Sequence, residues 1–193
     1  RCADEIAKAG AKVYGHNLET AASHFDAICS SHSWDERMKT IEYIKKSGMG
    51  LCSGGIFGMG ESRQQRVEFL QQVAYIAPDM IPLNFLNPLP GTKLAALKPL
   101  DADEALTTLA VARFALPDRN LMVAGGKEVV LGDRVGEVFK TGINCVMVGN
   151  YLTTAGTDPA FWGREAAKYG MTMPTGCIEI EGSGSTCSSK STG

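Results

Sequence analysis

A cysteine followed at once by a glycine-rich loop is the part of the sequence best suited to chemistry. Cys52 ends a short apolar stretch, and the loop Ser53-Gly-Gly-Ile-Phe-Gly-Met-Gly-Glu61 comes next. Ser62 and Gln65 then have the spacing of a capping box at the start of a helix. Active sites of α/β folds lie where strands end and helices begin, and a thiolate there is a ligand for soft metals. A tight turn with a buried structural cysteine is the alternative that the sequence leaves open.

Other polar side chains follow stretches that predict strands, so we expect them at the same edge of a sheet. Successive parallel strands point their carboxyl ends the same way, and the loops after them converge. Together with Cys52, the residues expected at this rim are His16, Asn17, Glu19, Asn84, Lys127 and Asn150. Amides, a thiolate and opposite charges suit a polar organic ligand and a soft metal. The ordinary alternatives stay open: asparagines as turn formers, Glu19 and Lys127 as solvated charges, and Arg37 as an exposed charge in the first turn of a helix.

The common catalytic motifs are not found in this sequence. The glycine loop is neither a dinucleotide-binding fingerprint nor a P-loop. The chain has no Ser/His/Asp order, no H-E-x-x-H and no paired metal-ligand spacing. Composition and spacing therefore predict a ligand-binding rim without defining a reaction.

Alternating strand and helix patterns predict that a parallel sheet built from βα units positions this rim. We expect strands at about residues 12–15, 50–53, 80–86, 121–124 and 143–148. We expect helices at about residues 2–9, 33–47, 62–77, 101–115, 134–141 and 159–170, with an irregular segment up to Ser31. A complete (β/α)₈ barrel typically needs about 250 residues. The fold class predicted is therefore α/β, a partial (β/α)₈ TIM-type barrel of about five βα units, with a complete doubly wound sheet as the alternative.

Apolar spacing also predicts which side of two helices faces the core. In the helix after Ser62, the residues expected to point inward are Val67, Leu70, Val73 and Ala74. In the helix after Asp101, where Glu104 would complete a cap, they are Leu106, Leu109, Ala110 and Phe114.

Length and composition limit the classes of protein that fit. The chain has 193 residues, 44% hydrophobic content and a net charge of -2, which suits one sizeable core. The absence of a basic excess argues against a nucleic-acid partner, and no apolar run approaches the roughly 20 residues of a membrane span. The six cysteines show no C-x-x-C, which favours a reducing, cytoplasmic location. The chain starts with Arg and no signal peptide follows. Its first residues have the pattern of a helix already under way, so we expect that the start of the protein is missing.

Several stretches, in this order, resemble the biotin synthase family of radical S-adenosylmethionine (SAM) enzymes. They are Tyr14-Gly-His-Asn-Leu-Glu-Thr20, Trp34-Asp-Glu-Arg37, Cys52-Ser-Gly-Gly-Ile-Phe-Gly-Met-Gly-Glu61, Pro82-Leu-Asn-Phe-Leu86, Val111-Ala-Arg113 and Ala124-Gly-Gly-Lys-Glu128. The resemblance covers roughly residues 1–170. It implies that residues 1–171 are the C-terminal part of a radical SAM barrel whose N-terminal part is missing. Residues 172–193 would be a disordered polar tail.

The resemblance also implies an activity and its cofactors. Members of the family convert dethiobiotin to biotin: a [4Fe-4S] cluster, whose ligands lie outside this chain, cleaves SAM to a 5′-deoxyadenosyl radical that abstracts hydrogens. Sulfur comes from an auxiliary iron–sulfur cluster. Implied partners are dethiobiotin, an electron donor such as flavodoxin or ferredoxin, and a second copy in a homodimer. The isolated chain would be inactive. Alternatives are a related enzyme of the same branch, such as a hydrogenase-cofactor maturase or methylornithine synthase, and a non-catalytic ligand-binding barrel fragment.

Site residues follow from the same resemblance. Cys52 would be catalytic as a ligand of the auxiliary cluster, for which thiolate is the natural ligand. The other implied contacts are Asn17 and Asn84 with substrate or SAM, Glu19 with the SAM ribose, Arg37 with the SAM carboxylate, and Ile56 with adenine. Three positions depart from the family: Gly15 replaces an Asn, Glu19 replaces an Asp of many members, and Lys127 replaces an Arg that ligates the auxiliary [2Fe-2S] cluster. The type of the auxiliary cluster is therefore left open.

Overall fold

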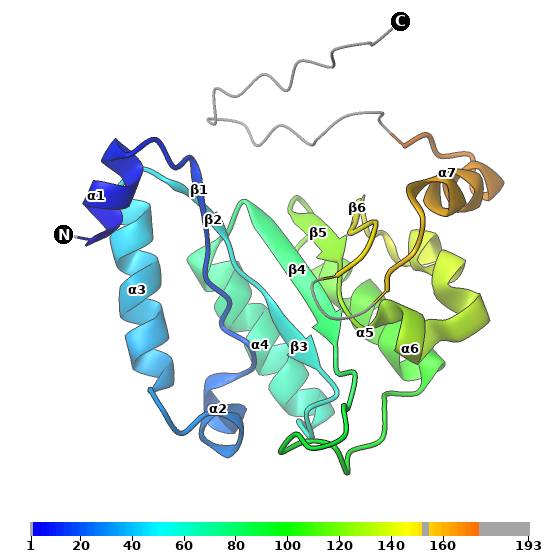
Figure 1. The fold of residues 1–193 in the computed structure, drawn as a ribbon, viewed down its shortest axis with the longest axis horizontal. Helices are drawn as coiled ribbons and strands as arrows, with labels where there is room; N and C mark the ends of the chain where they lie inside the picture. Colours follow the sequence, from blue (N-terminus) through cyan, green and yellow to red (C-terminus); the bar gives the residue numbers. More distant parts are fainter. Residues whose placement is uncertain (1, 152–154, 174–193) are drawn as a thin grey trace, which may run out of the picture.

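The computed structural model describes residues 2–151 and 155–173, which form a parallel β-sheet with helices packed along it (Figure 1). The strands are β1 (Val13–Gly15), β2 (Gly50–Cys52), β3 (Gly55–Phe57), β4 (Met80–Phe85), β5 (Asn120–Val123) and β6 (Cys145–Val146). Their order in the sheet is β1-β2-β4-β5-β6, and β3 pairs with β4 beyond the end of β2. All of these pairings are parallel, which confirms the predicted βα architecture.

The helices connect these strands and follow several of the sequence signals. They are α1 (Cys2–Lys8), α2 (Ala22–Ile28), α3 (Trp34–Lys46), α4 (Arg63–Ile76), α5 (Ala102–Ala115), α6 (Lys127–Leu131), the 3₁₀ helix η1 (Gly132–Thr141) and α7 (Pro159–Lys168). Both predicted capping boxes form, Ser33 with Glu36 and Ser62 with Gln65. None of the helices in the described part of the chain is long and apolar enough to cross a membrane.

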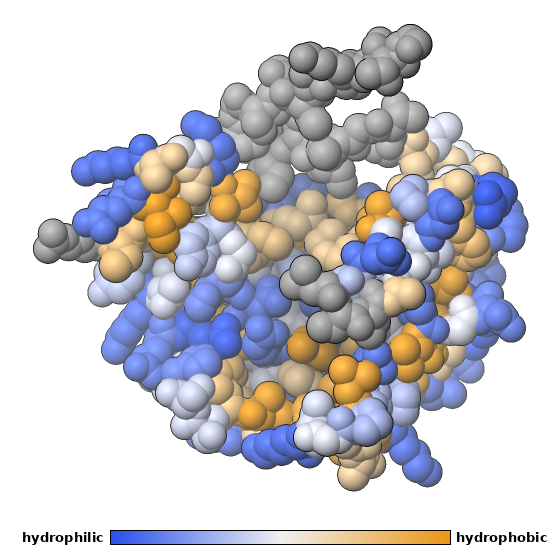
Figure 2. Space-filling view, viewed as in Figure 1, coloured by the Kyte–Doolittle hydropathy of each residue, from blue (hydrophilic) through white to orange (hydrophobic). Residues whose placement is uncertain are grey.

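The hydrophobic core lies between the sheet and the helices α3, α4 and α5 (Figure 1). Alternate residues of each strand point to this side, among them Leu51, Leu83 and Val123, which are at most 1% exposed. Their neighbours along the strands therefore point to the opposite face. Figure 2 shows that this opposite face carries hydrophilic and hydrophobic residues side by side. The sheet thus presents a mixed face on which a polar ligand can be bound.

Two segments differ from the expectations. The stretch up to Ser31 was expected to be irregular, but it contains α2, whose Phe25 is buried. The glycine-rich loop after Cys52 contains the strand β3. Residues 174–193, which make up nearly all of the expected tail, lie outside the described part of the chain.

The core-facing sides of α4 and α5 agree only in part with the predicted ones, since Leu70, Val73 and Leu109 are buried as predicted. On α4, Phe69 and Ile76 are buried, whereas Val67 and Ala74 are exposed. On α5, Phe114 is 87% exposed. Asp101 caps α5 by accepting from the backbone N–H of Asp103. Glu104 does not complete a capping box, because its carboxylate is bound by arginines of α4.

Candidate active site

The centre of the rim is the pair formed by Gly54, in the link between β2 and β3, and Gly55, the first residue of β3, where three pieces of backbone meet. A Cβ on Gly54 would lie 1.9 Å from the carbonyl oxygen of Pro82 in β4. A Cβ on Gly55 would lie 2.4 Å from the carbonyl oxygen of Glu19 in the loop after β1. Such distances exclude any side chain, so the two glycines are needed for the close approach of these backbones. The glycines therefore lock the loop after β1 onto β3 and β4.

The loop after β1 is bound to this glycine pair through its own polar groups. The side-chain oxygen Oδ1 of Asn17 accepts a hydrogen bond from the Gly54 N–H at 3.1 Å. The Glu19 N–H donates to the Gly54 carbonyl at 3.1 Å, and the Ile56 N–H donates to the Glu19 carbonyl at 2.8 Å. These bonds hold Glu19 in the left-handed region, with a φ of 70°. Residues other than glycine rarely adopt this backbone conformation, and those that do are concentrated at functional sites.

Arg37 reaches this loop from the first turn of α3. Its Nη1 donates to the Asn17 carbonyl at 2.7 Å and lies 4.0 Å from Oε1 of Glu19. Its side chain is only 17% exposed, so the interpretation of Arg37 as an exposed charge is wrong. Its Nε is buried and has no hydrogen-bond partner among the described residues. Burial raises the pKa of Glu19, and the Arg37 charge opposes that shift.

Asn84 and Ile56 extend the rim along β4 and β3. The two residues are direct partners in the parallel register, so their side chains lie next to each other on the mixed face. Asn84 Nδ2 donates to the Gly55 carbonyl at 3.1 Å, and its Oδ1 accepts from the Gly125 N–H at 2.9 Å. These two bonds use half of the hydrogen-bonding capacity of the amide, and they connect the loops after β2 and β5.

Cys52 and His16 lie at the ends of the two neighbouring strands β2 and β1. Cys52 is the register partner of Gly15, and the His16 N–H donates to the Cys52 carbonyl at 2.9 Å. The Cys52 thiol is partly buried, and burial raises its pKa. Burial, followed by the charges of Arg37 and His32, lowers the pKa of His16. The described residues contain no group of three His, Cys, Asp or Glu placed to hold a metal, so Cys52 could supply only one ligand of a set.

Lys127 is fully buried, which contradicts its interpretation as a solvated charge. Its Nζ lies 2.9 Å from Oε1 of Glu128 and donates to the Tyr151 hydroxyl at 2.5 Å. The ammonium also lies 5.1 Å and 5.5 Å from the ring centres of Tyr151 and Trp162. Burial lowers the pKa of Lys127, while the hydrogen bond and charge of Glu128 oppose the shift. Lys127 is thus committed to protein partners, and a protonated amine has no lone pair for a metal.

Asn150, the last of the predicted rim residues, makes only a local contact among the described residues. Its side chain is exposed, and its Oδ1 accepts from the Gly156 N–H at 3.3 Å within the same loop. The structure therefore brings together the residues after β1 to β5, while Asn150 serves the loop that follows β6.

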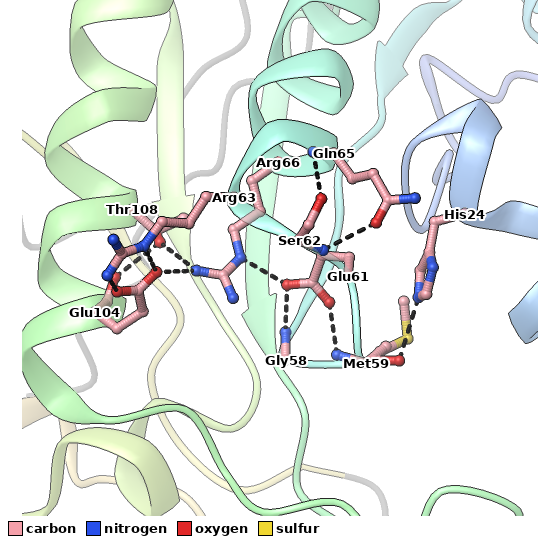
Figure 3. Close-up of polar contacts among 10 residues, drawn as sticks. All are labelled: His24, Gly58, Met59, Glu61, Ser62, Arg63, Gln65, Arg66, Glu104 and Thr108. Carbon is pink, nitrogen blue, oxygen red and sulfur yellow. Dashed lines mark hydrogen bonds and ion pairs between the residues drawn. The ribbon is translucent and has the colours of Figure 1, made fainter.

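Glu61 and Arg66 form a buried ion pair next to the glycine loop (Figure 3). This pair was not predicted from the sequence. The Glu61 carboxylate accepts from the N–H groups of Gly58 and Met59, both at 2.8 Å, and from Nε of Arg66 at 2.7 Å. Arg66 also donates to Glu104 of α5 at 2.7 Å. These bonds fix the loop that follows β3, and with it the position of Ile56. The only sequence signal was a Glu five residues before an Arg, with no indication that either is buried.

Comparisons with known proteins give the families that the chain matches. Residues 1–73 match the radical SAM superfamily, and residues 82–172 match the Biotin and Thiamin Synthesis associated domain. The biotin synthase of Parafrankia sp. (strain EAN1pec) is 51% identical over 156 residues, 81% of this chain and 43% of that protein. The biotin synthase of Anaeromyxobacter sp. (strain K) is 48% identical over 165 residues, 86% of this chain and 46% of that protein. The chain thus spans less than half the length of these relatives.

A solved structure supports the fold itself. The crystal structure of methylornithine synthase superposes with a TM-score of 0.73 over 89% of this chain and 55% of that chain, at 20% sequence identity. The parallel sheet of this chain is accordingly the partial TIM-type barrel that the sequence predicts. The family matches and the curated relatives define the chain as a radical SAM protein. Within that superfamily it belongs to the biotin synthase family.

Proposed function

We propose that this chain forms the SAM- and substrate-facing part of an enzyme that inserts sulfur into dethiobiotin to give biotin. The observation that carries the proposal is the joined set of Asn17, Glu19 and Arg37 around the glycine pair, which follows Cys52 at the end of β2. Glu19, whose backbone has a strained left-handed conformation, offers a carboxylate acceptor. Arg37, whose buried Nε has no partner among the described residues, offers a donor, so the two can bind one zwitterionic ligand. The chain's identity of about half with biotin synthases supports the same substrate.

The side chains fit SAM by their chemistry. Arg37 would bind the carboxylate through its planar fork, Glu19 would accept hydrogen bonds from the ribose hydroxyls, and Ile56 would pack on adenine. Asn17 and Asn84, already positioned by Gly54, Gly55 and Gly125, would present their remaining amide groups to substrate or SAM. When bound, SAM and its [4Fe-4S] cluster supply the 5′-deoxyadenosyl radical, and an auxiliary iron–sulfur cluster supplies sulfur.

Cys52 fits as one thiolate ligand of the auxiliary cluster, with the other ligands from elsewhere in the protein. Burial raises the pKa of its thiol, so a nearby positive charge, such as iron, would be needed to hold it as thiolate. Lys127 does not fit as a ligand, because its ammonium is fully buried against Glu128 and Tyr151. Either the cluster takes its fourth ligand elsewhere, or the enzyme acts on another substrate. Because the buried Lys127 cannot replace the cluster-ligating Arg of the family, a related enzyme of the same branch is the second candidate function.

The proposed partners follow from the reaction. Radical formation needs one electron, so a small redox protein of the flavodoxin or ferredoxin kind would supply it, in the cytoplasm. A homodimer is the proposed assembly.

The test is biotin formation from dethiobiotin by the complete protein carrying Cys52→Ala. Loss of product is expected if Cys52 holds the sulfur-donating cluster. Cys145→Ala is the matched control, since Cys145 is a buried thiol on another strand of the same sheet. Wild-type turnover by Cys52→Ala would return Cys52 to a structural role. Equal loss in both variants would point to lost folding instead.

A further inference from the structure

A thiol and an imidazole lie in contact between α2 and α3, away from Cys52. The Cys29 Sγ lies 3.4 Å from Nδ1 of His32 and 3.5 Å from the Ser31 hydroxyl oxygen. The Ser31 hydroxyl is itself 2.9 Å from the same His32 nitrogen. Cys29 is partly exposed, so a small molecule can reach it. Thiol, hydroxyl and imidazole therefore form one hydrogen-bonded group at the surface.

The surroundings of this group favour the thiolate form of Cys29. Hydrogen bonds from the Ser31 side chain and backbone lower the pKa of Cys29, and the Arg37 charge adds to the shift. Burial instead raises the pKa of Cys52 and Cys145. Because the thiolate is the nucleophile, reactivity should differ in the same order.

Contacts lead from this group to the rim. The His32 ring packs edge-on against Phe25, with ring centres 5.7 Å apart. The Arg37 guanidinium also contacts Phe25: its central carbon lies over the Phe25 ring, 5.7 Å from the ring centre. Phe25 is only 1% exposed, so it cannot move without its neighbours. Arg37 in turn holds the Asn17 carbonyl at 2.7 Å.

We propose that Cys29 is a thiol-modification site that exchanges with small-molecule disulfides such as glutathione disulfide, and that the resulting mixed disulfide weakens ligand binding at Arg37. The Cys29 thiolate attacks one sulfur of the disulfide, whose S–S bond breaks as the new S–S bond forms. His32 accepts the proton of the Cys29 thiol as the thiolate forms, and the leaving thiolate takes up that proton. The second half of the proposal rests on the proposed function, because it takes SAM as the ligand. The added bulk pushes on His32 and Phe25, which position Arg37.

The modification is tested on the complete, anaerobically prepared protein with glutathione disulfide and peptide mapping by mass spectrometry. Cys29 should form the mixed disulfide faster than Cys2, which is exposed on α1. His32→Gln should slow the reaction of Cys29 by about tenfold and leave that of Cys2 unchanged. Equal rates at Cys29 and Cys2, or an unchanged rate in His32→Gln, would overturn the proposal.

The coupling is tested by equilibrium binding of SAM before and after the modification. Wild-type protein should lose about tenfold in affinity, and Cys29→Ser treated in the same way should lose nothing. Arg37→Gln separates the two proposals. If Arg37→Gln weakens SAM binding but the mixed disulfide does not, the coupling is overturned. If neither changes the affinity, the assignment of Arg37 to SAM in the proposed function is wrong, while the mapping result for Cys29 stands.

Discussion

Replacing Arg66 by methionine should destabilise the protein far more than the same replacement of Arg63, one turn earlier on α4. The Arg66 side chain is 10% exposed and pairs with Glu61, which is 2% exposed, whereas Arg63 is 83% exposed. Breaking a buried pair by removing one partner costs about 3–5 kcal/mol, and an exposed pair contributes about 0–1 kcal/mol. Two backbone N–H groups still bind Glu61 in the variant. We therefore expect a loss near the lower end, about 3 kcal/mol for Arg66→Met.

Urea unfolding followed by circular dichroism measures both variants against the wild type. Methionine keeps most of the aliphatic stem, so the difference reports the guanidinium. Glu61→Gln combined with Arg66→Met should cost less than the sum of the two single changes, because each alone already breaks the pair. Equal free energies of unfolding for Arg66→Met and Arg63→Met would refute the reasoning that burial decides the strength of this cluster.

Three other changes test other parts of the structure. Gly54→Ala should cost about 3 kcal/mol in unfolding free energy, since its Cβ would meet the Pro82 carbonyl, and a loss below 1 kcal/mol in denaturation would contradict the close approach. Mössbauer spectra of the complete protein should show an auxiliary cluster unlike the Arg-ligated [2Fe-2S] form, and a [2Fe-2S] centre unchanged in Lys127→Ala would show that this position does not specify the cluster. The hydrogen bond from Arg63 lowers the pKa of Glu104 to about 2, so its stabilising effect is present above pH 4.5 and lost as the pH falls toward 2. Acid titration of stability should therefore show a smaller loss in Glu104→Gln than in wild type, and identical curves would exclude the effect.

Local sequence signals predicted the parts of the fold that local chemistry determines. The two capping boxes begin α3 and α4 as predicted, and alternation of patterns gave the parallel sheet. The helix α2 was missed because Ala21 begins it without a side-chain cap, so no polar signal marks its start. The strand β3 was missed because Gly54 and Gly55 are poor strand formers, and here only the approach of neighbouring backbones explains them.

The site residues divide in the same way. Positions at or just after the carboxyl ends of strands could be predicted, since strand direction alone brings Asn17, Cys52 and Asn84 to one edge. The burial of Arg37 and Lys127 could not, because it depends on partners far along the chain. Arg66 and Glu104 are 38 positions apart, and neither residue type signals a buried partner. Phe114 shows the reverse error, an aromatic residue expected in the core that is exposed.

The glycine pair also has a consequence for how the rim opens. Asn17 and Asn84 are held by amide groups of Gly54 and Gly125 and by the carbonyl of Gly55, all of them main-chain atoms of the sheet or of its connecting loops. The side chains of the rim can therefore be released only when these hydrogen bonds of the backbone break together. We expect the rim to behave as one cooperative unit, with slow and concerted exchange of these amide hydrogens. Its geometry would then be kept or lost as a whole.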